Sequence, residues 1–214
     1  MLRDIASNEL FTILIVTGLI FVTLAKMVSP KRFNDLISII SNFKYLKIYG
    51  REQKFLDTFD GLLFVNLMLS VSIFGSIVYQ NMMDTKILSI NIIVKLIFGI
   101  GSLILIKVLL ERLIASLFNI DSVIDSYLFQ KISYKNFMGL VLIPINALLL
   151  YTIPQSLTNI YIMVILLLII NLLGVMTSFK SHQSLLKHNF FYFILYLCAL
   201  EIAPYIILFK VFIA

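Results

Sequence analysis

Six long apolar runs make up most of this sequence, and they leave few folds open to it. Each run comes close to the roughly 20 residues that an α-helix needs to cross the apolar layer of a bilayer. The chain is 61% hydrophobic, well above the average of about 45–50% for soluble domains. Helices satisfy their backbone hydrogen bonds internally, as lipid demands. We therefore predict a single all-α transmembrane bundle over residues 1–214. The expected spans cover residues 8–28, 60–82, 87–113, 134–151, 160–179 and 189–211.

Two amphipathic segments lie between these spans. In residues 30–48, Phe33, Leu36 and Ile37 follow helical spacing, so one face of a helix there is apolar. We expect this helix to lie in the headgroup plane of the membrane, and the alternative is a helix packed on the bundle. Residues 121–131 predict a second, shorter amphipathic helix.

Lysines and arginines gather on one side of the expected membrane. Most of the 17 follow the first, third and fifth spans, and basic loops are retained in the cytoplasm. We expect a multi-pass protein of the bacterial cytoplasmic membrane with both termini in the periplasm. The first apolar run has full span length and no cleavage pattern, so it is expected to be a retained anchor. Cys198 is the single cysteine, so no disulfide framework is expected.

The last apolar run carries a carboxylate, Glu201, near its middle, with Pro204 and Tyr205 shortly after it. A charged side chain at this depth costs about 2.5–3.5 kcal/mol on insertion scales, so Glu201 should point into the bundle, protonated or paired. Pro204 leaves the carbonyl of Leu200 without its helical donor. One interpretation is a proton or substrate site at the kink. The other is a polar staple that fixes how the helices pack.

Other spans also contain polar residues. Lys95 lies inside the third span, where its ammonium can snorkel outward or serve as the counter-ion of Glu201. The fourth span contains Pro144 and Asn146. Two spans interrupted by proline are a known pointer to a transporter site, although proline is also frequent in ordinary spans.

Charged residues also border the expected cytoplasmic face. Lys107 and Glu111 are four residues apart and can pair on one helix face, and Arg112 follows them. Asp121 and Asp125 are also four apart and, with Glu111, offer a carboxylate cluster for a cation. Because Asp121 is already explained as a helix N-cap, we expect no metal site.

Motifs of known enzyme classes are missing from the sequence. It contains no G-x-S-x-G, H-E-x-x-H or Walker pattern. His182 and His188 fall in one loop, which argues against a haem held within the bundle. We expect no cofactor and no nucleic-acid partner, because the basic residues follow the membrane edge.

Four stretches resemble an uncharacterised domain-of-unknown-function family of Bacteroidota inner-membrane proteins. They are SPKRF around position 30, YGREQK at 49–54, LFQKISYKNF at 128–137 and YLCALEIAPYIIL at 196–208. The resemblance covers nearly the whole chain. It implies a polytopic inner-membrane protein, and it carries over no catalytic residue.

Three functions remain open from the sequence. The first is a subunit or scaffold of an envelope complex, such as protein-export or gliding machinery, with no chemistry of its own and with partner subunits in the membrane. The second is a small proton-coupled transporter that uses Glu201. The third is an intramembrane enzyme on lipid that uses Glu201 or the pair Asp121 and Asp125, although no converging set of polar groups is evident.

Overall fold

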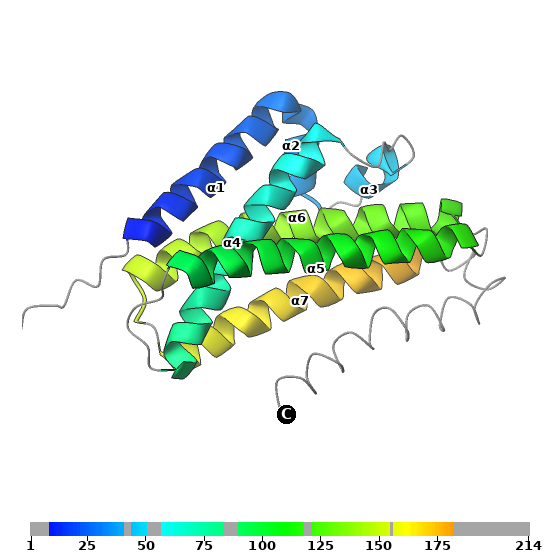
Figure 1. The fold of residues 1–214 in the computed structure, drawn as a ribbon. Coiled ribbons are helices and arrows are strands. Elements are labelled where there is room, and N and C mark those ends of the chain that lie inside the picture. Colours follow the sequence, from blue (N-terminus) through cyan, green and yellow to red (C-terminus); the bar gives the residue numbers. More distant parts are fainter. Residues whose placement is uncertain are drawn as a thin grey trace, which may run out of the picture.

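The described residues of the computed structural model are 9–40, 44–50, 57–83, 90–117, 121–154 and 156–181, and they fold into α-helices (Figure 1). Five of the helices are long and apolar enough to cross a membrane, which confirms the predicted all-α membrane bundle. The sixth expected span, 189–211, lies outside the described residues. The helices are α1 (Glu9–Val28), α2 (Pro30–Ile37), α3 (Lys44–Tyr49), α4 (Thr58–Met83), α5 (Ile90–Leu117), α6 (Asp121–Tyr151) and α7 (Leu157–Ser181).

Helix α4 is the centre of the bundle. It packs against α1, α5 and α6, while α7 packs on α6 (Figure 1). Half of the α4 span is buried, against 17% of the α5 and α7 spans. The outer faces of α5 and α7 therefore expose many leucine and isoleucine side chains, which lipid solvates as well as protein does.

Glycines allow the close approach of α4 to its neighbours. A Cβ atom added at Gly139 of α6 would lie 2.9 Å from the Cα atom of Leu67 on α4. At Gly101 of α5, the same atom would overlap the end of the Met68 side chain. Small residues at such crossings let van der Waals packing hold helices together in lipid, where the hydrophobic effect contributes little.

The amphipathic segment after the first span is helical, but it forms two helices where one was expected over 30–48. Helix α2 ends at Ile37, and the hydroxyl of Ser38 donates a hydrogen bond to the carbonyl oxygen of Asp35 at 2.9 Å. Such local bonds compete with helix continuation. The chain turns there, and the segment is folded back onto the bundle.

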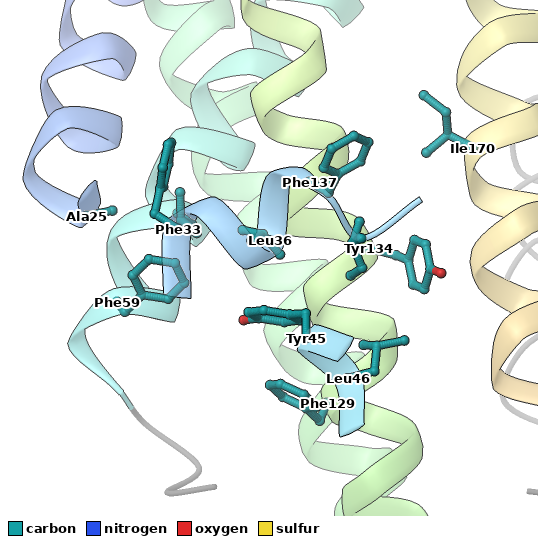
Figure 2. Close-up of a cluster of buried hydrophobic side chains, with 12 residues drawn as sticks. Ala25, Phe33, Leu36, Tyr45, Leu46, Phe59, Phe129, Tyr134, Phe137 and Ile170 are labelled. Atoms are coloured by element: carbon teal, nitrogen blue, oxygen red, sulfur yellow. The ribbon is translucent and has the colours of Figure 1, made fainter. Parts of the chain in front are cut away.

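An aromatic cluster holds this segment against the transmembrane helices (Figure 2). The rings of Tyr45 and Phe129 stack with their centroids 5.6 Å apart. Phe33 and Leu36 of the expected apolar stripe thus meet protein, whereas Ile37 and Ile40 remain 52% and 45% exposed. The buried members of the cluster are Ala25, Phe33, Leu36, Ile39, Tyr45, Leu46, Phe59, Leu63, Phe129, Tyr134, Phe137 and Ile170.

The amphipathic helix expected over 121–131 and the span expected over 134–151 form one continuous helix, α6. Its 31 residues include Pro144 without a break. At 1.5 Å per residue the helix is about 46 Å long, longer than the roughly 30 Å apolar layer. The helix is therefore long enough to cross that layer and to extend beyond it.

Gly139→Ala should lower the thermal unfolding midpoint of the purified protein in detergent. The new methyl group meets the α4 backbone, and overpacking of this kind costs about 1–3 kcal/mol. Gly99→Ala is the matched control, because a Cβ atom there meets nothing within 4 Å. Both substitutions gain the same helix propensity, so equal midpoints for the two variants would contradict the close crossing.

Candidate functional site

Most of the described basic side chains lie at one end of the bundle. Here α1 and α5 end and α4 and α6 begin, and α2 packs against α1, α3 and α6 (Figure 1). We call it the basic end. The side chains in this region can bind charged groups, so the basic end is the candidate functional site.

Arg32 of α2 is the most connected of these residues. It is 8% exposed and donates hydrogen bonds to the carboxylates of Asp57 and Asp60, the latter at 2.5 Å. Its Nε also donates to the hydroxyl of Tyr45 at 3.3 Å, and its guanidinium carbon lies 4.7 Å from the centre of the Phe59 ring. We call Arg32, Tyr45, Asp57 and Asp60 the Arg32 clamp, because they join α2 and α3 to the start of α4.

The surroundings keep Arg32 charged and Tyr45 neutral at neutral pH. Burial lowers the pKa of Arg32. Tyr45, Asp60 and Asp57 together raise this pKa by more than burial lowers it, so the net shift is upward. Burial, together with the nearby Asp60 charge, raises the pKa of Tyr45 to about 12. At neutral pH the guanidinium is therefore charged and the phenol neutral. The clamp has one cation for two carboxylates.

Asn136 of α6 completes the link to the rest of the bundle. Its Nδ2 donates to Asp60 Oδ1 at 3.4 Å. The Asn136 side chain is fully buried, and its Oδ1 has no hydrogen-bond partner among the described residues. A buried acceptor without a donor is uncommon and requires an explanation.

A second buried ion pair joins α5 to α6. Lys131 Nζ donates to Glu111 Oε1 at 2.6 Å, and the Glu111 side chain is 0% exposed. The expected pairing of Glu111 with Lys107 on the same helix stays a prediction, and the structure adds Lys131 of the neighbouring helix as a partner. Arg112 and Asp125 form a looser pair at 3.9 Å that is open to solvent on both sides, and such surface pairs contribute about 0–1 kcal/mol.

A pocket of about 180 Å³ lies between α4, α5 and α6, next to the Arg32 clamp. On α4 and α5 its polar lining residues lie nearer the basic end than its apolar ones, whereas on α6 the apolar Leu128 and Ile132 come before Lys135 and Asn136. The polar lining residues are Asp57, Asp60, Arg112, Asp125, Lys135 and Asn136. The apolar lining includes Phe64, Leu67, Ile104, Val108, Leu128 and Ile132.

Farther into the bundle, three polar side chains meet between α4 and α6. Asn146 Nδ2 donates to the carbonyl oxygen of Ser70 at 2.9 Å, and Ser70 Oγ donates to Asn66 Oδ1 at 3.4 Å. All three are nearly fully buried. Asn66 Nδ2 and Asn146 Oδ1 have no hydrogen-bond partner in the described part of the chain.

Several residues that the sequence singled out fall elsewhere. Glu201, Pro204 and Tyr205 lie outside the described residues, so both interpretations of Glu201 stay predictions. Lys95 is exposed on α5. Asp121 begins α6, and its side chain is not among those described.

No three His, Cys, Asp or Glu side chains of the described ranges are grouped as a metal site requires. The carboxylates that the sequence suggested for a cation instead have basic partners where their side chains are described. Glu111 pairs with Lys131, and Asp125 pairs with Arg112.

Sequence reasoning missed the Arg32 clamp. Arg32 lies off the apolar stripe of its helix, so the helical spacing gives no sign that its side chain is buried. The available signal was Asp57 and Asp60, two acids three residues apart at the start of an apolar span. A helix N-terminus stabilises nearby negative charge only modestly. Two acids at this position therefore predict a basic partner from another segment.

Arg32→Gln should destabilise the protein strongly, because it leaves the largely buried Asp60 carboxylate without its charge partner. Breaking a buried pair costs about 3–5 kcal/mol. Because the Asp57 side chain is 43% exposed, we expect a loss near the lower end of this range. Thermal unfolding in detergent measures the loss. Lys31→Gln is the control, since Lys31 is exposed on the same helix, and a similar loss there would contradict the clamp.

Lys131→Met should also destabilise the protein, since Glu111 is then buried without a cation. The double variant Lys131→Met with Glu111→Leu should recover much of that loss, because buried pairs replaced by apolar residues are often neutral. Chemical unfolding in mixed micelles compares the three proteins. A double variant no more stable than Lys131→Met would contradict the claim that the unpaired Glu111 carboxylate causes the loss of stability.

Residues 11–212 match the family described as a domain of unknown function, DUF4271. The match covers nearly the whole chain, which confirms the uncharacterised family that the four sequence stretches resemble. No curated protein and no solved structure matches the chain.

Proposed function

The chain belongs to the domain-of-unknown-function family DUF4271, and from its own residues we propose that it is a non-catalytic scaffold subunit of a cell-envelope complex. The complex lies in the bacterial cytoplasmic membrane. The resemblance to Bacteroidota inner-membrane proteins makes protein-export or gliding machinery the candidate complexes.

The observation that carries this role is how the buried charges are used. Arg32 pairs with Asp57 and Asp60, and Lys131 pairs with Glu111. Each pair joins different helices, so its charges fix helix positions. A catalytic site instead needs polar groups that converge on a space for a reacting atom. Rigid contacts between helices suit a subunit that holds others in place.

The outer helices offer the surface that partner subunits need. On α7, Leu168 and Leu172 are 55% and 61% exposed, and α5 has a similar apolar face. These faces can meet lipid or the helices of another subunit. In this proposal the basic end faces the cytoplasm, in keeping with the positive-inside rule. Both termini are then periplasmic, and α2, α3 and the start of α6 meet cytoplasmic partners.

Site-specific crosslinking in native membranes tests the scaffold role. A photo-reactive residue at Leu168, and in a second protein at Ile106 of α5, should give a protein adduct of one fixed mass from at least one site. The control position is Leu149, which is fully buried in α6 and should give none. Adducts to lipid alone at every outer position, with a lone monomer after gentle extraction, would contradict the proposal.

A second function, a small proton-coupled transporter, has one observation in its favour. The polar cluster of Asn66, Ser70 and Asn146 lies within the spans and has two amide atoms without hydrogen-bond partners. Polar groups at this depth often mark a transport path. In this alternative Glu201 takes up the proton beside the kink at Pro204.

Glu201→Gln separates the two functions, because it keeps the size of the side chain and removes its ionisation. A transporter should lose its function in cells while the protein remains at normal abundance. A scaffold should keep its function, because the glutamine amide can still form hydrogen bonds. Complementation of a deletion strain, with protein level as the control, measures the difference.

A further inference from the structure

On two of the three helices that line it, the pocket at the basic end changes from charged to apolar along the bundle, while on α6 Lys135 and Asn136 follow the apolar Leu128 and Ile132. On α4, Asp57 and Asp60 line its outer part, while Phe64 and Leu67 line its inner part. On α5 the order is the same, from Arg112 outside to Ile104 inside. A membrane lipid has this gradient, with its headgroup at the edge of the bilayer and its acyl chains toward the middle.

The size of the pocket suits part of a lipid. Its volume is about 180 Å³, slightly more than an engineered apolar cavity of about 150 Å³ that takes up benzene. The pocket therefore holds a headgroup and the first carbons of an acyl chain. The rest of the lipid can lie along the outer face of α5, where Leu105, itself a lining residue, is 49% exposed.

The polar lining identifies the headgroup. It carries both signs of charge, with carboxylates at Asp57, Asp60 and Asp125 and cations at Arg112 and Lys135. Guanidinium and ammonium groups bind phosphate oxygens. The carboxylates favour a positive group beside that phosphate, so the lining matches a zwitterionic headgroup better than a purely anionic one.

Asn136 distinguishes between zwitterionic headgroups. Its buried Oδ1 accepts no hydrogen bond among the described residues, and it lies on the pocket wall beside Asp60. A primary ammonium has three N–H donors and can bond both this oxygen and a carboxylate. A quaternary ammonium has no N–H and leaves the Asn136 oxygen unsatisfied.

We propose that this pocket is a binding site for an ethanolamine phospholipid, with its ammonium at Asp60 and Asn136 and its phosphate at Arg112 and Lys135. The headgroup site is separate from the outer faces assigned to partner subunits, and only the acyl chain reaches the outer face of α5. The lipid site requires only the three helices that line the pocket. The proposal of this site is therefore independent of the scaffold role.

Native mass spectrometry of the full chain tests the site. The protein is incorporated into micelles containing equal amounts of dioleoyl phosphatidylethanolamine, phosphatidylcholine and phosphatidylglycerol, and bound lipid is identified from its mass. One phosphatidylethanolamine should be retained about tenfold more than phosphatidylcholine, the effect of one hydrogen bond to a charged group. Equal retention of the two, or a preference for phosphatidylglycerol, would overturn the proposal.

The variant Gly61→Leu tests whether the lipid binds in this pocket. Gly61 lines the pocket, and a Cβ atom there meets nothing within 4 Å, so a leucine side chain can occupy the space without a clash. The preference for phosphatidylethanolamine should disappear. Gly75→Leu is the control, because Gly75 is on the same helix, has the same free space and is not a lining residue. An unchanged preference in Gly61→Leu would overturn the site.

A measurement on the unmodified protein does not depend on how the variants fold. A ligand that binds the folded state alone raises the unfolding midpoint. Phosphatidylethanolamine added to the protein in detergent should therefore raise the thermal midpoint in proportion to its concentration, and phosphatidylcholine should not. The same midpoint with both lipids would count against recognition of the ammonium.

Discussion

The contact between Arg32 and the two carboxylates at the start of α4 is the interaction on which the rest of the basic end depends. One guanidinium, 8% exposed, binds Asp57 and Asp60. A charge in such a position is stable only when it is paired and hydrogen-bonded, so α2 cannot leave the bundle without exposing or orphaning charges. Arg32 also contacts Tyr45 and Phe59, two members of the aromatic cluster of Figure 2.

Different interactions stabilise the basic end and the membrane-spanning part of the bundle. At the basic end, ion pairs and aromatic packing fix the short helices and the first turns of α4 and α6. Inside the membrane, close crossings at glycines such as Gly139 and a few buried amides hold the same helices together. Helix α4 belongs to both regions, because it carries Asp60 at one end and Ser70 farther along.

Hydropathy alone predicted the fold class, because lipid leaves helices as nearly the only solution for runs of that length. The ends of α1, α4, α5 and α7 lie within a few residues of the expected spans, whereas α6 begins 13 residues before the expected start of the fourth span at 134. The break at Ser38 and the continuity of α6 were not predictable in this way, because they depend on local hydrogen bonds and on contacts between segments. Asn146 was identified as polar and intramembrane, but its partner Ser70 is 76 residues away in sequence. The clamp was missed for the same reason, since Arg32 and Asp60 are 28 residues apart.

A double-mutant cycle on Arg32→Met and Asp60→Asn most directly tests whether buried charges serve as ties between helices. The unfolding free energies of the wild type, the two single variants and the double variant give the coupling between the side chains. Direct contact predicts a coupling of about 1–3 kcal/mol, since contacting residues in one ion-pair network fall in this range. A coupling near zero, with the two single effects simply additive, would contradict the account.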